Sequence, residues 1–213
     1  TTTGETLAFT GSGTVASANV QNNQSVTIGS IAIADGSGGG LASNYNLTTG
    51  TFDISQKWVS VGGQKIYDAT TTVSSSDLEV TGEVTGESIS ITGTGSVTDK
   101  NVGSGKTIDI SGLSLSDGSH SASNYTIGTT SFAITRRNLS ISGEKVYDGT
   151  GTVLASQIDT VNTAGGETLT ISGEGSVSLP SVGTNKSITL NTLGISDGTN
   201  GTIGLASNYT LDS

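Results

Sequence analysis

Apolar and polar residues alternate along most of this chain. Alternation with period two places one set of side chains on a buried face and the other in water, as in a half-buried β-strand. The clearest alternating pairs are Ile108/Ile110, Leu113/Leu115, Phe132/Ile134, Leu139/Ile141, Ile188/Leu190 and Leu193/Ile195. Gly, Asp and Asn separate these runs, and no stretch has the apolar spacing of a helix. The pattern therefore predicts an all-β fold with little or no helix, apart from short helical turns near residues 73–78 and 153–158.

One set of landmarks occurs three times, about 80 positions apart. The landmarks are Gly4-Glu5, Gly86-Glu87 and Gly166-Glu167; Asn19-Val20, Asn101-Val102 and Ser181-Val182; Asp35-Gly36, Asp117-Gly118 and Asp197-Gly198; and Asn44-Tyr45, Asn124-Tyr125 and Asn208-Tyr209. A repeat this long is a small domain, whereas the units of a solenoid run about 20–50 residues. We expect an incomplete first repeat at 1–54, a second at 55–134 and a third, lacking its last strand, at 135–213. The chain then represents a window from a longer array.

The second repeat shows which strands to expect. We predict a strand over 57–67 interrupted near Gly62-Gly63, a turn at Asp68, a strand pair over 87–97, a hairpin of 106–111 with 113–116, and final strands at 124–127 and 131–135. Short antiparallel strands of this kind favour tandem small β-domains, β-grasp-like or sandwich-like, in an elongated arrangement. The first repeat lacks the opening strand, which leaves an open sheet edge able to pair with another chain.

Composition narrows the possible partners. The net charge is −10, from 18 acidic and 8 basic residues, so we expect no nucleic-acid binding. There is no Cys, which excludes disulfides, and no apolar run is long enough for a signal peptide or a membrane span. Only 31% of the residues are hydrophobic, so each repeat has a thin core, and contacts between neighbouring repeats are expected to supply part of the stability.

The most prominent motif is Lys-x-Tyr-Asp-x-Thr, at residues 65–70 and 145–150. Its tyrosine is expected to pack at a core margin with its hydroxyl group bonded, and its aspartate to open a turn. Ala69 stands where the other copy has Gly149, which indicates that the position does not require a positive φ. In the Ala-Ser-Asn-Tyr motif, Asn is expected to satisfy backbone groups and Tyr to pack, with a sugar-binding pair as the alternative.

Three aspartates, Asp35, Asp117 and Asp197, open loops of different lengths. Each loop offers one carboxylate, whereas calcium takes six to eight oxygen ligands. We therefore assign no metal-binding residues and no cofactor, and keep calcium at junctions between repeats only as an open alternative.

No catalytic residues are assigned, and an enzyme is not expected. The segment 101–107 resembles a phosphate-binding loop, but Lys100 replaces the first glycine and a strand is predicted to follow. The single His120 lies in a variable loop without a counterpart in the other copies, and with no Cys and one His the sequence assembles no nucleophile–base pair. Trp58 is expected to pack between repeats or at an edge.

Two covalent modifications stay open at this point. Several Asn-x-Ser/Thr sequons allow glycosylation. An isopeptide bond from Lys65 or Lys145 to Asn124 or Asn208 is conceivable, although no apolar cradle with a catalytic carboxylate is evident.

Taken together, Lys145-Val146-Tyr147-Asp148-Gly149-Thr150, the Asn-Val-Gly-x-x-Lys segment and Ala-Ser-Asn-Tyr-Thr resemble the YDG/MBG-type repeat domains. These domains occur in tandem in large bacterial surface exoproteins, including filamentous-haemagglutinin-like adhesins exported by the two-partner route. The resemblance implies a grasp-like all-β module, located outside a Gram-negative cell.

The expected function follows from that resemblance. It is a structural segment of a cell-surface or secreted adhesin, acting as a stalk or adhesive array in cell adhesion or biofilm formation. Its expected partners are other repeats of the same protein and host or matrix glycans or proteins. The alternative is a binding module in which the repeats themselves bind a glycan or matrix ligand.

Overall fold

A computed structural model describes residues 4–212 of the chain, and the fold is all-β as predicted. The helices among these residues are six 3₁₀ helices of three residues each. The chain divides into two compact units. The first comprises residues up to 59 with 82–89 and 115–126, and the second comprises 60–81, 90–114 and the residues from 127 on.

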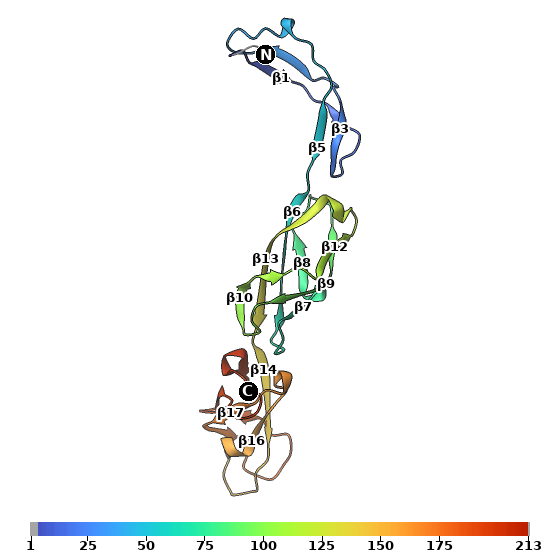
Figure 1. The fold of residues 1–213 in the computed structure, drawn as a ribbon. Helices are drawn as coiled ribbons and strands as arrows, with labels where there is room; N and C mark the ends of the chain where they lie inside the picture. Colours follow the sequence, from blue (N-terminus) through green and yellow to red (C-terminus); the bar gives the residue numbers. More distant parts are fainter. Residues whose placement is uncertain (1–3, 213) are drawn as a thin grey trace. The chain divides into compact units, whose positions relative to one another are not determined.

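Unit 1 contains two small antiparallel sheets built from the N-terminal strands (Figure 1). Its elements are β1 (Leu7–Thr10), β2 (Thr14–Val15), β3 (Gln21–Thr27), β4 (Ala32–Asp35), the 3₁₀ helices η1 (Ala42–Asn44) and η3 (Ala122–Asn124), and β5 (Thr51–Ile54). β1 pairs with β4, and β3 lies between β2 and β5. β5 is therefore an edge strand.

Four strands have residues in both units: β6 (Lys57–Ile66), β9 (Ile89–Val97), β12 (Leu113–Asp117) and β13 (Tyr125–Thr135). Their sheets run in the order β10-β13-β6-β8 and β11-β9-β12, with β7 paired to β9. The added elements are β7 (Thr72–Ser74), η2 (Ser75–Asp77), β8 (Leu78–Thr81), β10 (Gly103–Lys106) and β11 (Ile108–Asp109).

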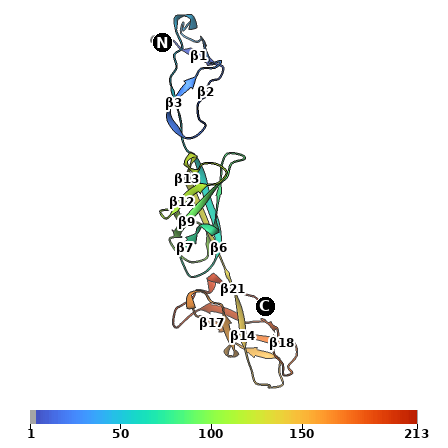
Figure 2. The same cartoon turned by 90° about the vertical axis from the view of Figure 1, so that its right-hand side faces the viewer.

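The remaining elements belong to unit 2, where β14, β17, β18 and β21 gather (Figure 2). They are β14 (Arg137–Gly143), β15 (Thr152–Leu154), η4 (Ala155–Gln157), β16 (Ile158–Val161), η5 (Ala164–Gly166), β17 (Leu169–Ser172), β18 (Glu174–Val177), β19 (Ile188–Thr189), β20 (Gly194–Asp197), η6 (Ala206–Asn208) and β21 (Tyr209–Leu211). Most pairs are antiparallel, but β14 and β21 are parallel, with Arg137 opposite Tyr209. This parallel pair departs from the antiparallel pairing that the sequence predicted.

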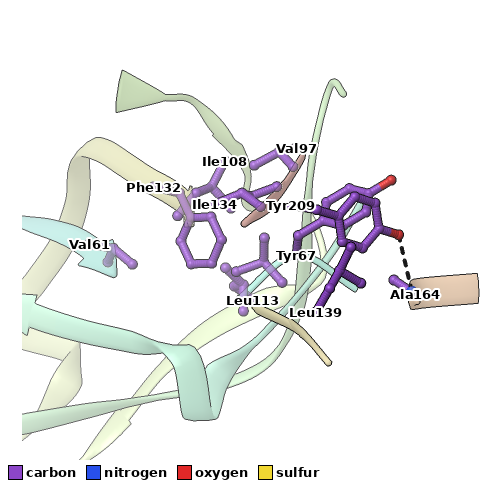
Figure 3. Close-up of a cluster of buried hydrophobic side chains, with 11 residues drawn as sticks. Val61, Tyr67, Val97, Ile108, Leu113, Phe132, Ile134, Leu139, Ala164 and Tyr209 are labelled. Carbon is purple, nitrogen blue, oxygen red and sulfur yellow. Dashed lines mark hydrogen bonds between the residues drawn. The ribbon is translucent and has the colours of Figure 1, made fainter. Parts of the chain in front are cut away.

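The main core of unit 2 is a cluster of buried apolar side chains (Figure 3). Its members are Val61, Tyr67, Val73, Val97, Ile108, Leu113, Phe132, Ile134, Leu139, Ala164 and Tyr209. The alternating pairs singled out from the sequence supply five of these eleven residues, namely Ile108, Leu113, Phe132, Ile134 and Leu139. A smaller cluster, Val153, Ile158 and Leu193, forms the core of the third repeat.

Four predicted features of the strands were wrong, and glycine explains the first. β6 runs without a break through Gly62 and Gly63, because the missing side chain lets a neighbouring strand approach: a Cβ at Gly63 would lie 1.9 Å from the carbonyl oxygen of Asp77. Residues 87–97 contain one strand, β9, and the two predicted final strands are one continuous β13. The predicted hairpin of 106–111 with 113–116 does not form, because β9 lies between β11 and β12. The short helical turns near 73–78 and 153–158 are confirmed as η2 and η4.

Candidate functional site: the junction between repeats

In every copy, the recurring glutamate bonds the tyrosine of the Asn-Tyr motif. These hydrogen bonds are Tyr45 to Glu5, Tyr125 to Glu87, and Tyr209 to Glu167. The Tyr209 hydroxyl group donates at 2.7 Å to Glu167 and accepts the backbone N–H of Ala164 at 3.1 Å. Two landmarks about 40 residues apart in sequence are thus one contact, which fixes where β21 begins.

The aspartates of the Asp-Gly loops position the Asn-Tyr motif. Each accepts the backbone N–H of the alanine that opens the following 3₁₀ helix: Asp35 from Ala42, Asp117 from Ala122 and Asp197 from Ala206, at 2.7–2.8 Å. The loop between them varies in length without moving this bond. The carboxylates therefore have a structural task in each copy.

The asparagine of the motif reaches the copy that precedes it in sequence. Within unit 2, the Asn208 carbonyl accepts the N–H of Val102 at 2.9 Å, and its amide donates to Asn101 at 2.9 Å. Asn208 is 1% exposed. Within unit 1, Asn124 makes the same two bonds to Val20 and Asn19, both at 2.9 Å. The prediction that Asn satisfies backbone groups is confirmed, but those groups belong to the preceding copy.

Four side chains from two copies meet beside this bond, and we call them the junction cluster: Tyr67, Lys100, Glu167 and Tyr209. Glu167 is 3% exposed; it accepts the Tyr67 hydroxyl at 2.7 Å and pairs with Lys100 at 2.5 Å. The two tyrosine rings meet edge to face, with centroids 5.4 Å apart, and they lie side by side in Figure 3. The Lys100 ammonium lies 6.0 Å from the Tyr67 ring centroid.

The electrostatics of the cluster favour one protonation pattern. Burial alone would raise the pKa of Glu167, but hydrogen bonds from Lys100, Tyr209 and Tyr67 outweigh it and hold the pKa below its usual value. Burial, followed by the hydrogen bond to Glu167, raises the pKa of both tyrosines. The hydrogen bond to Glu167 raises the pKa of Lys100. The buried Glu167 carboxylate therefore has three partners, two neutral tyrosine hydroxyl groups and one ammonium. Two of these partners, Tyr67 and Lys100, come from the other repeat, so the ionic contact depends on the repeats staying together.

The model of the YDG domain family matches residues 56–132 and 135–213. The chain belongs to the YDG domain family. Searches of curated proteins and of solved structures found no match. The junction cluster therefore joins two YDG domains, with Tyr67 and Lys100 from one and Glu167 and Tyr209 from the next.

In both YDG domains the Lys-x-Tyr-Asp motif forms a tight turn held by its lysine. Lys65 is buried and its ammonium donates to the carbonyls of Thr70 and Thr72, at 3.0 and 2.6 Å, besides pairing with Asp68. Asp68 accepts the N–H of Thr70 at 2.9 Å, as expected for a turn. Sequence reasoning missed the role of the lysine. It also misjudged Ala69, whose φ of 64° shows that the position is left-handed even without glycine.

The second YDG domain of the pair has the same turn in a more exposed setting. Lys145 pairs with Asp148 at 2.9 Å, and this lysine and the Thr150 N–H together lower the pKa of Asp148 to about 2. Tyr147 is 62% exposed, whereas its counterpart Tyr67 is fully buried. The turn is held alike in both domains, and Tyr67 is covered by the domain that contributes Glu167.

Other residues singled out from the sequence lie outside the junction cluster. Lys106, in the loop that resembled a phosphate site, lies in strand β10 and pairs with Asp99 at 2.5 Å. His120 is exposed and contacts Ser119. Trp58 is 72% exposed and lies in β6, which has a neighbour on each side, so it neither packs between repeats nor lies on an edge strand as was expected.

In unit 2, the side chains of Lys65 and Asn208, which an isopeptide bond would join, both bond other groups. The ammonium of Lys65 bonds carbonyls of its own turn, and the amide of Asn208 bonds Asn101. Within residues 4–212 no three His, Cys, Asp or Glu side chains gather as a metal site would need. Over the same range no helix has the length and apolar character to cross a membrane.

Proposed function

We propose that this chain is a structural segment of a bacterial cell-surface or secreted adhesin, in which YDG domains in series act as a stalk or adhesive array in cell adhesion or biofilm formation. The proposal places the protein outside the cell, with its own neighbouring repeats as first partners. It assigns the chain no catalysis and no nucleic-acid ligand. It also adopts the division into repeats at 1–54, 55–134 and 135–213.

The observation that carries the proposal is that recurring polar residues form contacts between successive domains. Tyr67 and Glu167 bond each other across two domains, and Asn208 bonds the backbone of Val102 in the domain before it. In a binding module, recurring polar side chains line an open ligand site. Here Tyr67, Glu167 and Asn208 are buried and hold one domain to the next, which is the requirement of a chain that transmits force or spans distance.

The mechanism is mechanical. The junction between the two YDG domains adds an ion pair and several hydrogen bonds to the thin cores of these small domains, so the pair resists bending and unfolding better than isolated domains would. A binding head carried at the far end is then held away from the cell surface. Binding of host or matrix glycans or proteins by the repeats themselves is the rival function, and the exposed Trp58 is the side chain best suited to it.

Small-angle scattering of the chain tests the stalk. A pair-distance distribution typical of domains on an extended line supports the proposal, whereas a compact particle contradicts it. A glycan and matrix-protein array distinguishes the rival: saturable binding lost in Trp58→Ala would make the repeats a binding module. Because Trp58 is exposed, that variant leaves the cores intact.

A further inference from the structure

Two junctions with the same asparagine contacts can be compared within the chain. Each consists of one asparagine and the Asn-Val pair of the copy before it. The first junction joins Asn124 to Asn19-Val20, and the second junction joins Asn208 to Asn101-Val102. All four hydrogen bonds are 2.9 Å long. The two junctions are therefore built on one plan, and a residue that differs between them can be assigned an effect of its own.

The residue directly before the Asn-Val pair is the one that differs. In the second junction it is Lys100, whose ammonium pairs with the carboxylate of Glu167 at 2.5 Å. In the first junction it is Ala18, and the third copy has Pro180 there. The valine two positions further on is present in all three copies. The position thus varies inside a segment that is otherwise kept.

The backbone around this position is held alike in both junctions. The side chain two positions before the asparagine accepts the backbone N–H of that asparagine. The acceptor is Ser17 in the first junction, at 3.1 Å, and Asp99 in the second, at 2.8 Å. The residue in between, Ala18 or Lys100, is therefore fixed from both sides, by this turn and by the asparagine contacts that follow it.

The glutamate that faces this position is also placed alike. Tyr125 bonds Glu87 and accepts the backbone N–H of Val84 at 3.2 Å, which is the arrangement that holds Glu167 in the second junction. In both junctions the glutamate follows that N–H by three residues. A long side chain in place of Ala18 would therefore reach Glu87.

The two junctions differ in charge. In the second, Lys100 offsets the charge of Glu167. In the first, the hydrogen bond to Glu87 raises the pKa of Tyr125, and the charges of Glu87 and of the nearby Glu83 add to this effect. Within residues 4–212, no ion pair includes Glu83 or Glu87. The first junction therefore presents two carboxylates to a position that holds only a methyl group.

We propose that the residue before the Asn-Val pair determines how strongly one repeat holds the next, and that Lys100 makes the second junction a reinforced, salt-sensitive link that the first junction, with Ala18, lacks. The partner that Lys100 recognises is the buried glutamate of the following repeat. The Lys100 side chain is 38% exposed and that of Glu167 is 1% exposed. Salt reaches the ammonium and screens the pair, and loss of the ammonium leaves a buried charge with hydroxyl donors alone.

The inference concerns contacts inside the chain and does not rest on the proposed function. An array whose links differ at one position has stronger and weaker junctions although its domains share one fold. The residue at this position is then the one to read in other repeats that carry the same Asn-Val and Asn-Tyr motifs.

Amide hydrogen exchange of the unmodified chain tests the difference at two matched groups. The N–H of Val20 donates to Asn124 and the N–H of Val102 donates to Asn208, so their exchange reports the opening of the first and the second junction. When NaCl is raised from about 50 mM to about 1 M, exchange at Val102 should quicken about twofold or more relative to Val20. The ratio of the two rates removes salt effects that act on the whole chain.

Two matched sets of variants separate charge from packing. Lys100→Met keeps an apolar stem without the ammonium, and it should quicken exchange at Val102 about fivefold or more and abolish the relative salt effect. Ala18→Lys should slow exchange at Val20 about two- to fivefold, because it adds the missing partner of Glu87. Ala18→Met is the control for the added stem, and in a Glu87→Gln background the gain from Ala18→Lys should vanish.

Three results would overturn the inference. The first is a Lys100→Met chain whose Val102 exchange and salt response equal those of the unmodified chain. The second is an equal effect of Ala18→Lys and Ala18→Met on Val20, and the third is a gain that survives Glu87→Gln. Ala18 is exposed, so its replacements leave the cores intact. The Ala18 variants and the salt series on the unmodified chain therefore decide the question even if Lys100→Met does not fold.

Discussion

The hydroxyl group of Tyr67 donates a 2.7 Å hydrogen bond to the carboxylate of Glu167, a residue 100 positions further along the chain. The tyrosine comes from the turn of one YDG domain and the glutamate from the next. Tyr209 donates to the other oxygen of the same carboxylate. Glu167 thus connects the tyrosine of its own domain to that of its neighbour, and it does so while 3% exposed.

Replacement of Asn208 by Ala should destabilise the chain by about 2 kcal/mol, because it removes a buried side chain that accepts the partly buried N–H of Val102. Asn44→Ala is the matched control, since Asn44 occupies the same motif position but is exposed. Its expected effect is below about 0.5 kcal/mol. Urea unfolding measures both, and equal effects would show that the asparagine acts within its own domain only.

Substitutions at the left-handed position after the Tyr-Asp pair should change stability through the backbone conformation. Gly149 has a φ of 79°, and a Cβ built there meets no atom within 4 Å, so Gly149→Ala should cost about 1 kcal/mol from conformation alone. Ala69→Gly should be smaller in magnitude, because relief of its left-handed strain is offset by loss of a methyl group packed on the core cluster. Thermal unfolding of both variants checks this, and a neutral Gly149→Ala would contradict it.

The junction cluster should make stability depend on pH at both extremes. The pKa of Glu167 is lower in the folded chain than its usual 4.5, so its contribution is full above that value and is lost as the pH falls through the folded pKa. The pKa of each tyrosine is raised above 10.0, so the folded chain holds protons that the unfolded chain releases, and stability falls as the pH rises above 10.

The variant Glu167→Gln separates the contribution of Glu167 to acid stability from the contributions of the other carboxylates. It should flatten the acid side of the stability profile below about pH 4.5, measured by urea unfolding at fixed ionic strength. Asp148 also has a lowered pKa, but it lies in the exposed turn and its contribution should persist in the variant. An unchanged acid profile in Glu167→Gln would contradict the electrostatic account of the junction.

Sequence patterns were sufficient for the fold class because period-two alternation depends on local side-chain burial. The pairs Phe132/Ile134 and Leu139/Ile141 lie in strands as predicted, and the turn at Asp68 forms. Glycine made one predicted strand boundary wrong. Two consecutive glycines, such as Gly62 and Gly63, usually indicate a strand break, yet here they permit the close approach of a neighbouring strand. That distinction depends on a neighbouring strand, which a single sequence does not place.

The junction was only half predictable for a similar reason. The recurrence of Glu167, Tyr209 and Asn208 was plain in the sequence, and a structural role followed from it for the tyrosine and the asparagine but not for the glutamate. Their partners did not follow, because Tyr67 and Val102 belong to a different domain. The spacing of repeats in sequence does not say which surfaces meet. The signal that could have found them is that the recurring polar residues outnumber what one small domain needs to close its turns.

A double-mutant cycle on Tyr67→Phe and Glu167→Gln in the full 213-residue chain tests the central claim most directly. The account predicts a coupling energy of about 1–3 kcal/mol in the free energy of unfolding, because Tyr67→Phe removes the donor of this buried bond and Glu167→Gln removes the charge of its acceptor. The cycle of Tyr147→Phe with Glu167→Gln is the control and should show coupling near zero. Equal coupling in both cycles, or none in the first, would contradict the claim that these residues hold successive YDG domains together.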